Sequence, residues 1–154
     1  MIGYVDKQVR KELLEAMRMG DLSLLRNYAL QFKKSLASQI NLRPEPAGNT
    51  VLHHALLMDF ETGTQLIDLD DSDQNDMKLI KKALAKESSK SLNVKAEVMH
   101  YLCVKGAGDA SLSNHYQITP HDIAKHLREN TQILRYMAGK PSLLSAIFGK
   151  KSYE

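Results

Sequence analysis

The sequence predicts an all-α protein that folds as one domain of paired helices. Apolar residues recur at helical spacing, and no segment shows the apolar–polar alternation of a half-buried strand. The composition agrees, because the chain has no Trp, only 6% aromatic residues, and many Leu, Ala and Lys residues, which favour helices. With 154 residues it is long enough to bury a core without disulfides.

The overall charge and the cysteine content limit the classes of partner and compartment. Hydrophobic residues make up 43% and charged residues 25%, a balance that argues against disorder. The formal net charge of +3 is too small to indicate nucleic acid as a partner. Cys103 has no second cysteine to pair with, which favours a reducing compartment. Without a signal-like N-terminus or a long apolar run, we expect a cytoplasmic protein that does not bind membranes.

The first helix pair is predicted over residues 8–40. Apolar side chains recur at helical spacing over residues 7–19, and Gly20 ends this helix. Asp21 then caps a second helix that reaches about residue 38.

A second pair is predicted over residues 45–70. The preceding loop contains two prolines and a glycine, and Thr50 caps a helix that reaches about Met58. Residues 61–69 are predicted as the return helix, although Gly63 weakens it by about 1 kcal/mol.

A third pair is predicted over residues 72–108, after an acidic surface loop at residues 68–76. Asp76 caps a helix over residues 77–86, whose lysines point outward. The serine-rich residues 88–91 break the pattern, and a further helix follows over residues 94–104.

The last pair is predicted over residues 114–139. Thr119, Pro120 and Asp122 form a strong helix start, in which Thr is the cap, Pro is the first helical residue and Asp answers the cap. Thr131 is predicted to cap the return helix, and residues 141–149 form a terminal capping helix.

Two of these helix starts carry a motif. Residues 48–55, Gly-Asn-Thr-Val-Leu-His-His-Ala, resemble the opening of an ankyrin repeat, and residues 119–124, Thr-Pro-His-Asp-Ile-Ala, resemble a second opening. The chain departs from that pattern in carrying Val51 for Pro, Gln117 for Gly, His121 for Leu and Asp122 for His. The structural motif residues implied by the resemblance are Gly48, Thr50, Leu52, His53, Ala55, Thr119, Pro120, Asp122 and Ala124.

The resemblance implies an ankyrin-type α-solenoid of about four stacked helix pairs with an irregular middle repeat. The two openings lie 119 − 50 = 69 residues apart, about two periods of roughly 33 residues. Residues 72–108 are therefore taken as a degenerate repeat between them. Each pair is too short to bury its apolar stripe alone, so neighbouring pairs must stack.

Such a stack implies a non-catalytic module that binds another protein on its concave face, as a monomer when free and without a cofactor. The resemblance places the contacts in the turns and at the ends of the first helices, at Pro46, Ala47, Asn49, Leu57, Met58, His115, Tyr116, Ile118, His126 and Leu127. For Leu57, Met58 and Leu127, an equal alternative is that they belong to the core.

Two other functions remain open at this stage. An adaptor or regulatory protein could act through the acidic loop and basic helix at residues 68–95, and ankyrin-type effectors delivered into host cells by intracellular bacteria are one such setting. An enzyme could use Cys103 with His100, three residues earlier on the same helix, but a buried thiol is usually inert, so we expect no catalytic residue.

No metal site is expected. Residues 71–75 match the first ligands of a calcium-binding loop, but Asp76 replaces its glycine and Lys82 its final glutamate. His121 and His126 diverge by about 140° on a helix and cannot share an ion.

Overall fold

The computed structural model of this chain is mostly helical, which confirms the predicted class at that level. Gly20, Asp21, Pro46 and the predicted terminal helix at 141–149 lie outside the described residues. The structure describes residues 11–16, 18, 23, 27, 38, 40–43, 47–68, 71–105, 108–128 and 130–138.

Helices α4 (Val51–Leu56) and α7 (Pro120–Ala124) begin in equivalent ways, as predicted. Thr50 and Thr119 are their N-caps, and both have extended backbone with ψ of 172° and 158°. In each helix the third residue returns its side chain to the backbone N–H of the cap.

Two further helices differ from their predicted starts. Helix α6 (Ser89–Met99) begins five residues earlier than predicted, because the Ser88 hydroxyl accepts a hydrogen bond from the Ser91 N–H at 3.1 Å and caps it. It continues as a π-helix, η2 (His100–Lys105). Helix α8 (Thr131–Met137) is preceded by Asn130 as its N-cap, so Thr131 is the first helical residue and not the cap.

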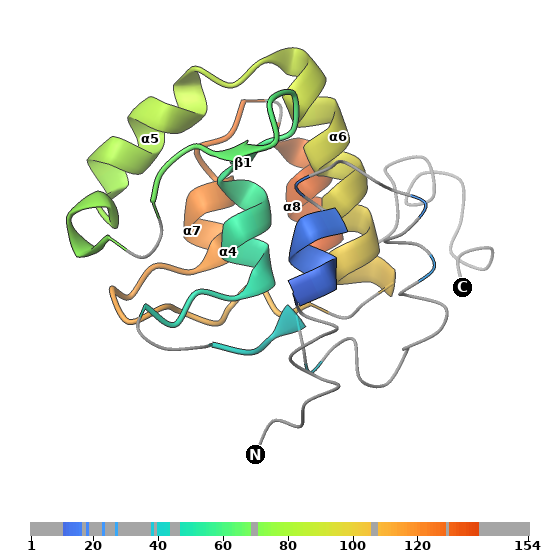
Figure 1. Cartoon of the computed structure of the whole chain (residues 1–154), viewed down its shortest axis with the longest axis horizontal. Helices are drawn as coiled ribbons and strands as arrows, with labels where there is room; N and C mark the ends of the chain where they lie inside the picture. Colours follow the sequence, from blue (N-terminus) through green and yellow to red (C-terminus); the bar gives the residue numbers. More distant parts are fainter. Residues whose placement is uncertain are drawn as a thin grey trace.

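These four helices pack as two adjacent pairs. Helix α4 packs on α6 and α7 packs on α8, while α4 also contacts α7 and α6 also contacts α8. Figure 1 shows α4 and α6 running in opposite directions, as the two helices of one hairpin do. The return helix of α4 is therefore α6, about 30 residues further along the chain than the sequence predicted.

The predicted middle repeat is corrected by this packing. Helix α5 (Met77–Ala85) contacts α7 and does not stand between α4 and α7. In Figure 1 it lies on the opposite side of α7 from α6 and α8. We therefore assign residues 57–88 to an insertion within one helix pair and not to the boundary between two pairs. A spacing of 69 residues fits both an intervening repeat and an insertion. The contact of α4 with α7 distinguishes them, because an intervening repeat would separate these two helices.

The predicted return helix at residues 61–69 is wrong. Strands β1 (Met58–Asp59) and β2 (Thr64–Gln65) form an antiparallel hairpin there. Gly63 lies in its turn with φ of +75°, and a Cβ at this position would lie 2.8 Å from the carbonyl oxygen of Arg18. The glycine that weakens a helix is therefore what permits the turn and the close approach of the N-terminal helix.

The acidic stretch and the basic helix follow the hairpin. Asp71 caps a short 3₁₀ helix, η1 (Ser72–Gln74), and its carboxylate accepts from the Asp73 N–H at 2.9 Å. Asp76 caps α5 as predicted, accepting from the Lys78 N–H at 2.7 Å.

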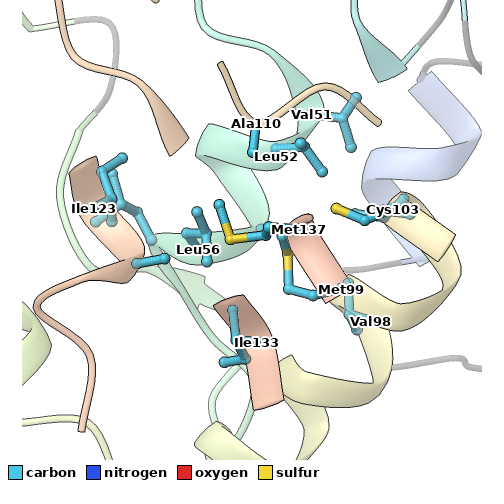
Figure 2. Close-up of a cluster of buried hydrophobic side chains, with 14 of the residues drawn as sticks. Val51, Leu52, Leu56, Val98, Met99, Cys103, Ala110, Ile123, Ile133 and Met137 are labelled. Atoms are coloured by element: carbon cyan, nitrogen blue, oxygen red, sulfur yellow. The ribbon is translucent and has the colours of Figure 1, made fainter. Parts of the chain in front are cut away.

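One apolar core joins the helices. Residues 11–16 are helical, and Leu13 and Ala16 are buried in this core, as their spacing predicted. Figure 2 shows that the cluster draws on α4, α6, α7 and α8 together with η2, and it labels Val51, Leu52, Leu56, Val98, Met99, Cys103, Ala110, Ile123, Ile133 and Met137. The pairs share a continuous seam, which neither pair could bury alone.

Candidate partner-binding surface

The turns that precede α4 and α7 lie side by side. The His115 N–H donates to the Ala47 carbonyl at 2.8 Å, and the Asn114 side-chain amide donates to the Asn49 side-chain oxygen at 3.0 Å. Gly48 has φ of +74°, and a Cβ there would lie 2.8 Å from the His115 ring. The glycine thus serves both the turn and the contact between the turns.

Asn114 shapes the second turn from within. Its side-chain oxygen accepts hydrogen bonds from the Tyr116 N–H at 2.9 Å and the Ile118 N–H at 3.0 Å. Gln117 takes the positive φ, 65°, at the position where the family resemblance implies glycine. The tip therefore exposes the side chains of His115 and Gln117, while Tyr116 is half-buried.

His53 joins the two helix starts. Its Nδ1 accepts a hydrogen bond from the Thr50 N–H at 3.0 Å, and its Nε2 lies 2.8 Å from the Ile118 carbonyl oxygen. A carbonyl can only accept, so Nε2 carries the proton and Nδ1 does not. One neutral ring thus caps α4 and binds the residue immediately before the cap of α7.

The electrostatics of the two starts differ. Burial lowers the pKa of His53 to about 4, although the Ile118 carbonyl and Asp122 act in the opposite direction. At α7 the Asp122 carboxylate accepts from the Thr119 N–H at 3.0 Å, and this bond is the main cause that lowers the pKa of Asp122. Asp122 therefore caps α7 as an anion, through a hydrogen bond within its own helix start.

The ten predicted contact residues differ in how far they are buried. His115 and His126 are exposed, Tyr116 is half-buried, and Pro46 lies outside the described residues. The other six cannot offer their side chains to a partner, because the packed turns and helices cover Ala47, Asn49, Leu57, Met58, Ile118 and Leu127. For Leu57, Met58 and Leu127 the core alternative is confirmed.

Sequence reasoning missed one exposed apolar residue. Leu79 on α5 is 44% exposed, and it is the only large apolar side chain so exposed within the part of the chain that the structure describes. The exposed lysines Lys78, Lys82 and Lys86 share its side of the helix. The available signal was that Leu79 falls among these lysines on a helical wheel and not among the inward residues.

A buried ion pair was also missed. Lys95 and Glu87 are fully buried, and the Lys95 ammonium lies 2.6 Å from the Glu87 carboxylate. The same ammonium donates to the Leu56 carbonyl at the end of α4, also at 2.6 Å. Burial lowers the pKa of Lys95 to about 8, and Glu87 and Asp59 oppose this shift.

Ser91 and Arg128 extend this pair into a network. The Ser91 hydroxyl donates to the second oxygen of Glu87 at 2.6 Å and accepts from the Phe60 N–H at 2.8 Å. Arg128, just beyond α7, donates to the Glu87 carbonyl. The network therefore connects the start of α6 to the end of α4, to Phe60 just after β1, and to Arg128 just after α7.

The groups considered for chemistry have structural surroundings. Cys103 is buried, and burial raises the pKa of its thiol to about 12, so it is protonated at neutral pH. The His100 ring packs against Tyr101 and Tyr136, with centroids 5.5 and 4.9 Å apart. Asp71, the first candidate calcium ligand, is used as the cap of η1.

Comparison of this chain with models of known protein families, with curated proteins and with solved structures finds no match. Among the described residues, no helix has the length and apolar character needed to cross a bilayer. Over the same residues, no three His, Cys, Asp or Glu side chains are grouped as metal ligands would be.

Proposed function

We propose that this chain is a short, irregular stack of ankyrin type that binds another protein without catalysing a reaction. The observation that carries the proposal is the bridge from His53 to the Ile118 carbonyl. It links two helix starts whose threonine caps share extended backbone, and the turns before them lie side by side. Stacked helix pairs with aligned turns offer an extended surface, which is the usual binding site of such proteins.

The binding surface that we propose consists of the turn tip, the exposed side of α7 and the two residues that follow this helix. It comprises His115, Tyr116, Gln117, His121, Lys125 and His126, and we call it the turn–α7 surface. Tyr116 supplies apolar area and a hydroxyl from a stiff side chain, and such residues often dominate protein interfaces. The hydrogen bonds of Asn114 hold the turn in shape before a partner arrives, which lowers the entropy lost on binding.

The state of Cys103 supports a binding role over thiol catalysis. A nucleophilic cysteine needs a thiolate and access to substrate, whereas this thiol is 4% exposed and has a pKa of about 12. The neighbouring ring of His100 packs against the rings of Tyr101 and Tyr136.

Affinity capture with crosslinking mass spectrometry tests the proposal. The full-length chain, immobilised, should retain a protein whose crosslinks map to Lys125 or its neighbours. Tyr116→Ala should then weaken binding of the purified partner by about tenfold, the effect of one interface hot spot. Asn93→Ala, on the exposed side of α6, is the matched control and should leave binding unchanged.

Two outcomes would overturn this function. One is a failure to retain any protein above the level of an unrelated helical control. The other is a purified partner that binds Tyr116→Ala as tightly as the parent chain while circular dichroism shows both to be folded.

A further inference from the structure

Helix α5 adds a basic face to the molecule. Lys78, Leu79, Lys82 and Lys86 are exposed on its outer side, and we call them the α5 basic face. Leu79, Lys82 and Lys86 are spaced i, i+3, i+7, so they form one stripe along about two turns of helix. The opposite side of α5 carries Ile80 and Leu84, which are buried.

The lysines of this face have no ion-pair partner within the described chain. Lys78, Lys82 and Lys86 form no ion pair with any carboxylate that the structure describes. The helix from Met77 to Ala85 contains no acidic residue, and Asp76 is engaged as its cap.

The positive charge extends from α5 onto α7. Burial lowers the pKa of His126, the nearby charges of Lys81 and Lys125 lower it further, and Asp122 acts in the opposite direction. Lys125 also forms a long ion pair with Asp122 at 3.8 Å. Two lysines and one carboxylate therefore lie near His126 where the two helices meet, so positive charge is in excess there.

We propose that the α5 basic face binds an acidic, amphipathic segment of the partner protein, an inference that rests on the proposed function. The chemistry comes from charge complementarity: acidic side chains would meet the lysines, and one apolar side chain would cover Leu79. Helix α5 belongs to the insertion at residues 57–88, and its apolar contacts with the core come from its inner side. Its outer side is left for a partner.

An acidic peptide fits this face better than a membrane or a nucleic acid does. Nine helical residues span about 13 Å, which matches a short peptide segment. Insertion into a bilayer needs a broad apolar face, and α5 exposes one large apolar side chain. Nucleic-acid phosphates would pair with the lysines but would leave Leu79 without a role.

The probe is a fluorescein-labelled synthetic peptide of about 15 residues that presents glutamates around one leucine stripe when helical. Binding to the full-length chain is measured by fluorescence anisotropy at low and high salt. We expect saturable binding that weakens with salt, and the double variant Lys78→Glu/Lys82→Glu should raise Kd by at least about tenfold. Leu79→Ser should raise Kd by about threefold or more without changing the salt dependence.

The matched control is a pair of single variants, Lys82→Glu and Lys90→Glu. Lys90 is an exposed lysine on α6, so the two variants change the net charge equally at different places. Lys82→Glu should weaken binding clearly more than Lys90→Glu. Equal weakening would show a non-specific charge effect and would overturn the inference.

Competing ligands decide between the classes of partner. The same variants are tested with a single-stranded RNA and with vesicles of phosphatidylcholine and phosphatidylserine. Tighter binding of either that is lost in Lys78→Glu/Lys82→Glu would overturn the assignment to an acidic peptide. If a captured partner depends on Tyr116 but not on the α5 basic face, this inference fails while the proposed function stands; if no partner is captured, the proposed function itself fails.

Discussion

Replacing His53 with asparagine separates its two tasks. The introduced asparagine is short, like Asp122 at the equivalent place on α7, and could still accept the hydrogen bond from the Thr50 N–H. It could not reach the Ile118 carbonyl, because the His53 ring spans that distance. The variant therefore keeps the helix cap and loses the bridge between the two helix starts.

The expected loss follows from burial. Ile118 is only 6% exposed, so its carbonyl would keep the hydrogen bond from the Asn114 N–H at 3.0 Å but would lose its ring donor in a place that water does not readily reach. The loss of one such hydrogen bond costs about 0.5–1.5 kcal/mol, and the missing ring atoms leave a small cavity as well. We expect His53→Asn to lower the free energy of unfolding by about 1–3 kcal/mol at neutral pH.

Urea unfolding followed by circular dichroism measures this loss. The control is Asp122→Asn, which changes a half-buried cap without a bridge and should lower the free energy of unfolding by about 1 kcal/mol or less. If His53→Asn were no more destabilising than Asp122→Asn, the bridge would not hold the two starts together. The reasoning about the stacked turns would then be refuted.

The pH dependence of the parent chain and His53→Asn gives an independent check. The pKa of His53 is about 4 in the fold and 6.5 ordinarily, so the unfolded chain takes up the proton first as pH falls. The stability that His53 contributes is complete above pH 6.5 and is lost as pH falls towards 4, by on the order of 3 kcal/mol. The difference between the parent chain and His53→Asn should therefore shrink over this range. A constant difference would contradict a buried neutral ring.

Three further outcomes follow from the buried groups. Lys95→Met should lower the free energy of unfolding by about 3–5 kcal/mol, because it leaves Glu87 buried without its cation. Adding Glu87→Gln should restore at least about 1 kcal/mol. Equal urea midpoints for the single and double variants would contradict this. Gly48→Ala should cost about 1–3 kcal/mol, since the positive φ and the His115 ring both oppose a Cβ, and an unchanged thermal midpoint would argue against that contact. A thiol reagent should label Cys103 much faster in urea than in the native chain, whereas rapid native labelling would exclude a buried, protonated thiol.

The helix starts could be predicted because their signals are local. Thr50, Thr119 and Asp76 cap the helices that they were expected to cap, since a cap needs only a side chain two or three residues from the amide that it satisfies. The same reasoning failed at Ser88. A cluster of serines indicates either a loop or a cap, and we predicted a loop. Because no helix was predicted there, the sequence did not show that Ser91 and Lys95 lie on one helix face with the preceding Glu87.

The surface residues were harder to predict than the caps. The resemblance to ankyrin repeats named Ala47, Asn49 and Ile118 for contact with a partner, yet they are buried. Leu79, which is exposed, was not among the predicted contact residues. Whether an apolar helical residue faces the core or the solvent depends on which neighbours reach it, and those neighbours are distant in sequence.

The amino-acid sequence by itself determined a helical chain, the starts of α4, α5 and α7, and the residues that cap them, because these depend on groups within one turn of helix. Only the tertiary structure decided that α6 is the partner of α4, that residues 57–88 are an insertion, and that Glu87 and Lys95 meet inside the molecule. The physical reason is that packing joins apolar faces and buried charges across tens of residues, whereas spacing along the chain is the same for a repeat and for an insertion of equal length.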